Sequence, residues 1–197
     1  MKLSQLSLPA GTFAAIALAG VYAFAQTPAP VAARQGEVPT QAPATKAVAE
    51  IKGSGFTGKA ELVERKDGTG TVVDVTVTLT GLKPGNHGVH LHAIGKCEPD
   101  FAAAGGHFDP GPAGNTDPDA NHPYHMGDLP NAVANISGSA TLKAVTTRVT
   151  ISPGPLSIFD ADGTAIIIHG NPDQGVTGEP KSGVSGGPRV ACGVFTK

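Results

Sequence analysis

The chain of 197 residues contains no tryptophan, only two cysteines and few charged side chains. Charged residues make up 15% of it, whereas 27 glycines and 17 prolines supply turns along its length. Long amphipathic helices need more charge and fewer helix-breaking residues, so this composition favours an all-β fold. The length suits one domain of that kind.

Neither sign of charge dominates the sequence. The formal net charge at pH 7 is −2, and no basic run occurs anywhere. Nucleic acid and anionic membrane surfaces attract strongly basic proteins. We therefore expect neither as a partner.

The N-terminus has the pattern of an export signal. Lys2 is the only early charge, an apolar stretch covers residues 13–25, and Ala23 and Ala25 are small enough for cleavage after them. The stretch is too short for a comfortable membrane span, so we predict a signal peptide over residues 1–25 and no integral membrane domain. An uncleaved anchor is the alternative. The expected location is the periplasm, the cell envelope or the extracellular space.

Residues 26–45 are rich in proline and alanine and lack hydrophobic periodicity. A segment with so few large apolar side chains cannot offset the entropy of ordering itself. We predict a flexible tether here, followed by a single domain over residues 46–197.

Short runs rich in β-branched residues, separated by turn residues, fill this domain. Eight strands are predicted, at residues 46–53, 58–66, 71–80, 89–94, 131–136, 139–145, 164–169 and 189–194. The series indicates an antiparallel Greek-key sandwich or flattened barrel, with a hairpin-type turn at residues 160–163. Two gaps, 95–129 and 170–188, have the length of functional loops.

All seven histidines lie between residues 87 and 169. His90 and His92 are two apart in a predicted strand, so their side chains share one face and can bind one metal ion. The other candidates lie in or beside the predicted loops: His107, His122, His125 and His169. The sequence therefore predicts a metal site built from imidazoles.

Cys97 and Cys192 are an isolated pair. In an exported protein such a pair most simply forms a disulfide, here between the first predicted loop and the last strand. Two free buried thiols are the alternative. Thiolate metal ligation is disfavoured because the histidines already suffice.

Five motifs occur in order: residues 87–92 (HGVHLH), 106–110 (GHFDP), 125–131 (HMGDLPN), His169, and 186–194 (GGPRVACGV). They resemble the motifs of copper/zinc superoxide dismutases, especially the exported bacterial ones, and the resemblance covers residues 46–197. It implies copper and zinc as cofactors, superoxide as substrate, and its conversion to dioxygen and hydrogen peroxide. A copper-binding or copper-delivery module on the same fold is the alternative. The resemblance allows either a homodimer or a monomer.

The resemblance also implies particular roles for residues. Copper is held by His90, His92, His107 and His169. His107 is in addition an imidazolate bridge to zinc, and it is catalytic together with Arg189, which docks the anion.

Three further expectations concern residues around the copper ligands. Asp173 resembles a carboxylate that hydrogen-bonds to ligands of both metals. Lys181 and Glu179 lie in the second predicted loop, where they either steer superoxide or are ordinary solvated charges. His87 is expected at a turn and is not a predicted ligand.

The zinc ligands depart from the family pattern at one position. The resemblance implies His107, His125 and Asp128, but Asn115 and Thr116 replace the histidine expected eight or nine residues after His107. His122 is the nearest substitute and completes the predicted set. Asp117, Asp119 and a water-completed site are the alternatives, because an open zinc position binds water.

Overall fold

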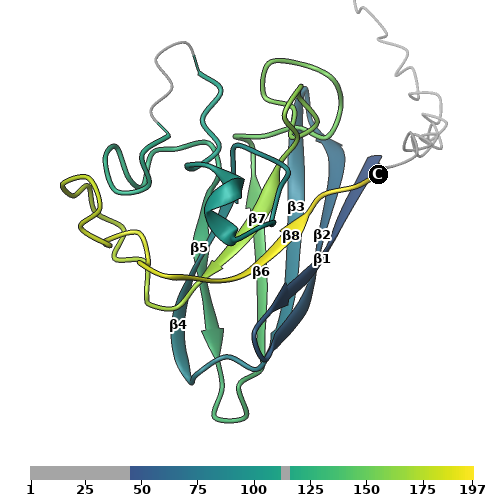
Figure 1. Ribbon diagram of the computed structural model, residues 1–197. Helices are drawn as coiled ribbons and strands as arrows, with labels where there is room; N and C mark the ends of the chain where they lie inside the picture. The colour runs from purple at the N-terminus through teal and green to yellow at the C-terminus, as the bar shows by residue number, and fades with distance from the viewer. Residues whose placement is uncertain (1–44, 112–115) are drawn as a thin grey trace, which may run out of the picture. The chain divides into compact units, whose positions relative to one another are not determined.

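The strands follow the alternation of apolar and polar residues. In β3 (Gly70–Thr80), Val73, Val75 and Val77 are buried, while the polar residues between them are more exposed. The computed structural model describes residues 45–111 and 116–197 (Figure 1). Its other strands are β1 (Thr45–Gly53), β2 (Phe56–Asp67), β4 (Gly85–His92), β5 (Asp128–Ala134), β6 (Ala140–Thr146), β7 (Ala165–His169) and β8 (Arg189–Val194).

Each predicted strand has a counterpart in the structure. The largest difference is in β4, which begins at Gly85 and not at residue 89. The signal peptide predicted over residues 1–25 and nearly all of the tether predicted over 26–45 lie outside the described residues.

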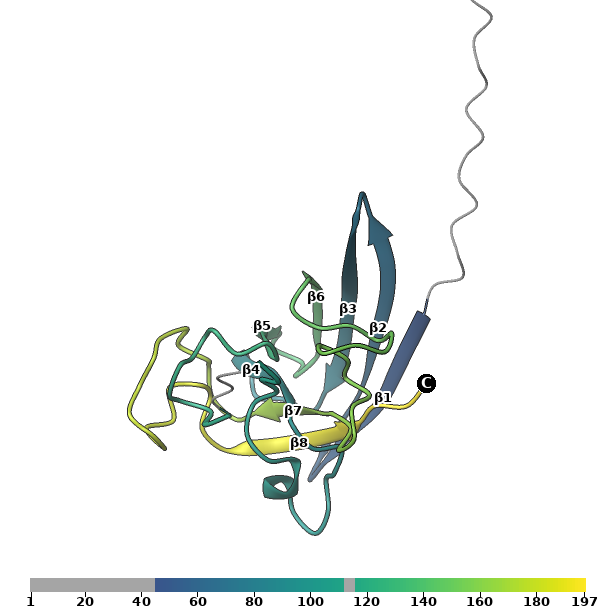
Figure 2. The ribbon, with the colours of Figure 1, turned by 90° about the horizontal axis from the view of Figure 1, so that it is seen from above.

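The strands form one antiparallel sheet in the order β5-β4-β7-β8-β1-β2-β3-β6. In Figure 2 the strands curve round in this order, and the edge strands β5 and β6 contact each other. The sheet is therefore a nearly closed barrel. Neighbours that are distant in sequence, such as β1 with β8 and β3 with β6, give it Greek-key character. The all-β prediction is confirmed.

Apolar side chains fill the inside of the barrel. Leu62 from β2, Val75 from β3, Leu91 from β4 and Ile166 from β7 are among the buried residues of one continuous core. Complete burial of each such side chain contributes about 1.5–3 kcal/mol to stability. This core provides a rigid frame for the loops that leave its strands.

Three long connections leave the barrel, one more than predicted. Residues 93–127 and 170–188 correspond to the two expected loops, and 93–127 includes a short 3-10 helix, η1 (Phe101–Ala104). The third is 147–164, between β6 and β7. No helix within residues 45–111 and 116–197 is long and apolar enough to cross a membrane.

The hairpin-type turn predicted at residues 160–163 is wrong. β6 pairs with β3, whereas β7 pairs with β4 and β8, so the strands on either side of the turn do not form a hairpin. Turn residues mark a change of chain direction, but they do not determine which strands pair. β7 pairs along both of its edges, with β4 and with β8, so no edge is left for β6.

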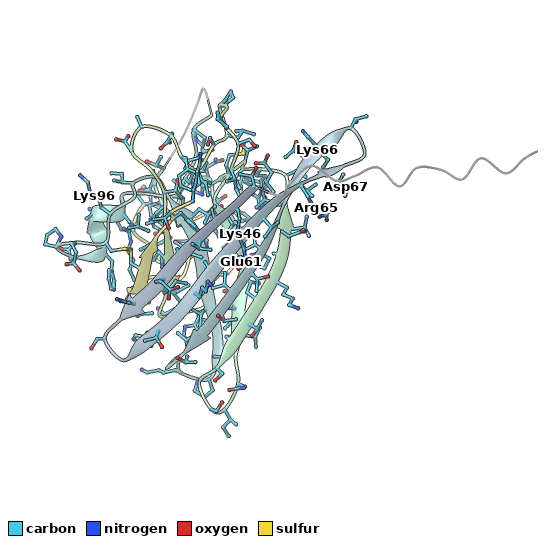
Figure 3. The ribbon with its side chains drawn as sticks, turned by 90° about the vertical axis from the view of Figure 1, so that its right-hand side faces the viewer. Lys46, Glu61, Arg65, Lys66, Asp67 and Lys96 are labelled. Atoms are coloured by element: carbon cyan, nitrogen blue, oxygen red, sulfur yellow. A yellow bond between two sulfur atoms is a disulfide. The ribbon has the colours of Figure 1, made fainter. Side chains whose placement is uncertain are left out.

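The predicted disulfide is present. Cys97 and Cys192 are joined, with an S–S distance of 2.02 Å, and this bond links loop 93–127 to β8. In Figure 3 the bond is drawn near Lys96. Closing a loop with a sequence separation of 95 contributes about 4–5 kcal/mol in the chain-entropy model. One end of the loop that carries His107 is thereby attached to the barrel.

The outer face of β1, β2 and β3 carries charged side chains that face solvent (Figure 3). Lys46 Nζ lies 2.8 Å from Glu61 Oε2, and Arg65 Nε lies 2.7 Å from Asp74 Oδ2. Such exposed pairs contribute about 0–1 kcal/mol each. This face is an ordinary solvated surface.

A buried glutamate attaches the third connection to the barrel. Glu64 of β2 accepts hydrogen bonds from the backbone N–H groups of Ile151 and Ser152 and from Ser152 Oγ. Burial raises the pKa of Glu64, but these hydrogen bonds outweigh burial, so its pKa is lower than usual. The Glu64 side chain is therefore ionised when it accepts these hydrogen bonds, and it attaches connection 147–164 to the barrel.

We predict that Glu64→Gln lowers the free energy of unfolding at pH 7 by about 1–3 kcal/mol. Because the folded-state pKa is lowered, the stabilisation is complete above the unfolded-state pKa and is lost as pH falls through the folded-state pKa. Denaturant unfolding across pH should therefore show the two proteins converging in acid. Glu61→Gln is the control, since its partner is the exposed Lys46. A difference that persists in strong acid contradicts this account.

Candidate metal centre

Strand β4 presents two histidines on one face, as its alternation predicts. Val89 and Leu91 belong to the barrel core, so His90 and His92 point to the opposite side of the strand. Both rings are completely buried, because loops cover this outer side of β4. His169, at the end of the neighbouring strand β7, is 2% exposed.

Loop 93–127 brings His107 against β4. The backbone of His107 pairs with that of His92 in antiparallel fashion, outside the named strands. The backbone N–H of His107 donates to Thr116 O at 2.9 Å. A Cβ on Gly106 would lie 1.8 Å from that same oxygen, so only glycine fits there. Gly105 has a φ of 73°, which also favours glycine. The backbone therefore approaches closely at Gly106, whereas a Cβ on Gly105 would meet the Ile94 side chain.

Four imidazoles converge at the first group of potential ligands. Within the described chain, one ligand atom from each of four residues lies within 4.8 Å of the others, and the four are His90, His92, His107 and His169. Four ring nitrogens have no hydrogen-bond partner among the described residues: His90 Nδ1, His92 Nε2, His107 Nε2 and His169 Nε2. Buried polar atoms without partners are costly, so this group fits a bound cation.

The opposite nitrogen of each ring is held by the protein. His92 Nδ1 lies 3.0 Å from Gly105 O, and His169 Nδ1 lies 3.0 Å from Gly187 O. A carbonyl oxygen only accepts, so each ring carries its proton on Nδ1 and keeps the Nε2 lone pair for a metal. Burial lowers the pKa of His92 and of His169 well below the usual value, so both rings are neutral ligands.

The second group is centred on Asp128. His107 Nδ1 lies 2.7 Å from Asp128 Oδ1, and the Nδ1 atoms of His125 and His122 lie 3.0 and 3.2 Å from Oδ2. Within residues 45–111 and 116–197, His122 Nδ1 makes no hydrogen bond, so its separation from Asp128 is that of an ion pair only. Ligand atoms of a tetrahedral zinc site with bonds of about 2.0–2.1 Å are about 3.3 Å apart. Ligand atoms of His107, His122 and Asp128 lie within 4.8 Å of one another, together with one of His90 and not of His125. His125 contacts only the same carboxylate, but imidazole and carboxylate donors of this kind suit zinc.

His107 belongs to both groups. Its Nε2 faces the first group, and its Nδ1 faces Asp128 in the second. Burial lowers the pKa of His107 to about 4, even though the Asp128 carboxylate raises it. The neutral ring therefore lies between two places where a cation fits, which suits a bridging ligand.

Asp173 joins the two groups. Its Oδ2 lies 2.9 Å from His90 Nε2, and its Oδ1 lies 2.7 Å from His122 Nε2. Burial raises the pKa of Asp173, but hydrogen bonds from His122 and His90 outweigh this and leave the pKa low. The Asp173 carboxylate thus orients one ring of each group.

His122 carries a proton when no metal competes for it. Burial lowers its pKa, but Asp128 and Asp173 together raise the pKa to about 9. A metal that binds His122 must displace this proton, so zinc affinity falls as pH decreases.

The aspartates considered as alternative zinc ligands have other contacts. Asp117 Oδ1 accepts from the backbone N–H groups of Asp119 and Ala120. The Asp119 carboxylate accepts from Gly183 and Ser185. Within the described residues, neither aspartate belongs to a group of side chains that could hold a metal ion.

Arg189 lies beside the first group, at a cavity of about 270 Å³ that includes His169 and Lys181 in its lining. Its guanidinium donates to Phe101 O at 2.7 Å and to Gly105 O at 2.6 Å. Burial lowers the pKa of Arg189, but a guanidinium stays protonated in proteins. The fixed positive charge can attract a small anion into the cavity.

His87 differs from the expectation that it falls at a turn. It lies within β4, next to an irregularity in the pairing with β5, and is only 4% exposed. Its ring nitrogens lie 2.8 Å from His169 O and 2.8 Å from Lys83 O. Its ring therefore links the last residue of β7 to the backbone before β4. His87 is absent from both groups of potential ligands.

Sequence reasoning missed Arg148, which lies in the third connection. Its Nη1 donates to His125 O at 2.9 Å and to Pro123 O at 3.3 Å, and its Nη2 donates to Asp128 O at 3.0 Å. One guanidinium therefore holds the backbone that carries His125 and Asp128. No local motif marks this arginine, because its partners lie 20–25 residues away.

Comparisons with known proteins agree with this geometry. The model of the copper/zinc superoxide dismutase family matches residues 56–195. A Cu-Zn superoxide dismutase of Caulobacter vibrioides is 40% identical over 123 residues, covering 59% of this chain and 67% of its own length. One from Brassica juncea is 38% identical over 155 residues, covering 76% and 96%. Another, from Aquifex aeolicus, is 36% identical over 142 residues, covering 70% and 78%.

Among solved structures, the crystal structure of the clock protein EA4 aligns with a TM-score of 0.64 at 28% identity, covering 77% of this chain and 94% of that one. Fold and site together define a β-barrel protein with two adjoining groups of side chains suited to metal ions. The chain belongs to the copper/zinc superoxide dismutase family, whose members are oxidoreductases that use copper and zinc.

We predict that Arg148→Ala weakens zinc binding by about 10–100-fold, because the backbone carbonyls of His125 and Asp128 lose their common donor. Arg148→Lys should restore only part of the affinity, since an ammonium cannot reproduce a planar fork of donors. Competition with a chelator measures the affinity. Arg65→Ala is the charge control, because Arg65 pairs with Asp74 on the solvated outer face. Parental affinity in Arg148→Ala would contradict the role given to this guanidinium.

Proposed function

We propose that this chain dismutates superoxide at a copper ion held by His90, His92, His107 and His169. The convergence of four unpartnered imidazole nitrogens carries this assignment. Copper bound there supplies one-electron redox chemistry, in which one superoxide is oxidised to dioxygen and a second, with two protons, is reduced to hydrogen peroxide. The complete imidazole set together with Arg189 favours the enzyme over a copper-delivery module.

Two side chains act on the substrate in this proposal: Arg189 docks the anion, and His107 delivers a proton. Arg189 attracts and docks the superoxide anion, since its charge lines the cavity beside His169. His107 delivers a proton from Nε2 to the peroxide product, while Asp128 keeps its Nδ1 side oriented. The proton is replaced from solvent. Lys181 at the same cavity extends the positive field outward.

Zinc, in the same proposal, is held by His107, His122, His125 and Asp128. The support is the spacing of the three Nδ1 atoms around the Asp128 carboxylate. A closed tetrahedral set gives a structural site that holds His107 in place for the reaction. Asp173 fixes the orientation of the His90 ring and of the His122 ring, and so links one proposed ligand of copper to one proposed ligand of zinc.

The disulfide and the bacterial relatives fit an exported protein. We propose that residues 1–25 direct the chain to the periplasm, the cell envelope or the extracellular space, and that residues 26–45 act as a tether there.

We predict that protein loaded with copper and zinc removes superoxide, and that His169→Ala lowers kcat/KM by more than about 100-fold. The variant should also bind less copper while its barrel folds normally, because the His169 ring is not part of the apolar core. Steady-state assays, metal analysis and circular dichroism check these points. Gln174→Ala, at an exposed position in loop 170–188, is the control. Near-normal turnover in His169→Ala would show that the copper assignment is wrong.

The zinc assignment has its own test. We predict that His122→Ala lowers zinc affinity by about 10-fold or more, whereas Asp117→Ala and Asp119→Ala keep their zinc. Zinc content after dialysis and chelator competition measure this. If His122→Ala keeps parental affinity and either aspartate variant loses zinc, then that aspartate is the ligand.

A further inference from the structure

A buried aspartate of the first loop accepts several hydrogen bonds from the second loop. Asp119 is 4% exposed, and its Oδ2 accepts from Gly183 N at 2.9 Å. Its Oδ1 accepts from Ser185 N at 3.1 Å and from Ser185 Oγ at 2.9 Å. The two residues are 66 positions apart in sequence, so this contact exists only in the folded protein.

The same aspartate also holds the other end of that segment. The carbonyl oxygen of Asp119 accepts from Gly178 N at 2.9 Å. Nearby, Thr177 Oγ1 donates to His122 O at 2.6 Å. Residues 178–183 therefore form a small lobe of the second loop, with both ends attached to Asp119. Lys181 lies inside this lobe.

This lobe forms one wall of the cavity beside Arg189. Asp119, Lys181, Gly183 and Ser185 line the same volume of about 270 Å³ as His169 and Arg189. Lys181 has a φ of 66°, a conformation that the attached ends of the lobe must maintain. A shift of the wall changes the distance between Lys181 and Arg189, and with it the field that an approaching anion experiences.

The carboxylate accepts these bonds as an anion. Burial raises the pKa of Asp119, but hydrogen bonds from Gly183 and Ser185 outweigh burial and lower it. Hydrogen bonds to an ionised acceptor are roughly twice as strong as neutral ones. Each N–H or O–H that faces the carboxylate donates, so an uncharged amide in the same place cannot satisfy all of them.

We propose that Asp119 is a positioning residue, which holds lobe 178–183 so that Lys181 and Arg189 face one access cavity for the superoxide anion. This inference rests on the proposed dismutase function. From the sequence, Asp119 is considered only as an alternative zinc ligand, whereas here it has a positioning role.

The Asp119→Asn variant separates a positioning role from a simple effect of charge, because the two predict opposite changes in the rate of anion capture. The substitution removes one negative charge beside the cavity. If only that charge mattered, capture of an anion would become faster. If Asp119 positions the lobe, capture becomes slower, because the Asn amide group faces the Gly183 N–H and cannot accept from it.

For fully loaded Asp119→Asn we expect kcat/KM to fall roughly tenfold and to depend less on ionic strength than in the parent. Adding Lys181→Met should then lower kcat/KM by a smaller factor than Lys181→Met does in the parent. Zinc affinity should stay at the parental value. In the metal-free protein, hydrogen exchange at the Gly183 and Ser185 amides should be faster, while the strands exchange as before.

Glu179→Gln is the matched control, because it removes one exposed negative charge from the same lobe and leaves the Asp119 hydrogen bonds in place. An Asp119→Asn enzyme as fast as the parent or faster, or with additive Lys181 effects, overturns the proposal. Loss of zinc overturns it in favour of a ligand role. An inactive parent enzyme would instead refute the dismutase function, while hydrogen exchange still tests the contact.

Discussion

The burial of six imidazole rings next to two carboxylates is the constraint on which the rest of this structure depends. Every ring is at most 2% exposed, and each has one nitrogen without a hydrogen-bond partner in the part of the chain that the structure describes. Such groups are tolerated inside a protein only if something else satisfies them. A metal ion in the first group meets this need for four of the rings. The carbonyl oxygens of Gly105 and Gly187 and the Asp173 carboxylate contact the opposite nitrogens of three of these rings, and so determine which lone pair each of the three offers.

The barrel and the loops contribute differently to this arrangement. β4 and β7 place His90, His92 and His169 on strands that the apolar core keeps rigid. The other ligands lie on or next to loop 93–127, which has little core of its own. Contacts from three directions hold it: the disulfide from β8, Arg148 from connection 147–164, and the hydrogen bonds with loop 170–188. The precision of the loop ligands therefore depends on the parts around them.

These attachments form a continuous chain of contacts from the barrel to the metal centre. Glu64 of β2 holds the backbone of Ile151 and Ser152, and Arg148 in the same connection holds the carbonyls next to two proposed zinc ligands. Asp173 and Asp119 then join the two long loops at different places, one at the metal ligands and one at the access cavity. Charge-assisted hydrogen bonds make each joint stronger than neutral contacts would.

The sequence by itself determined the eight strands, the His90/His92 pair, the cysteine pair and the family, because period-two alternation, turn residues and motif spacing are local properties. Only the tertiary structure decided between His122 and the alternatives Asp117 and Asp119 as the neighbour of Asp128. It also placed His87 inside a strand, and Arg148 and Asp119 at their partners. Asp173 lies 51 residues from His122, and Ser185 lies 66 from Asp119. Such distant contacts depend on how loops pack over a closed barrel, and no local pattern encodes that packing.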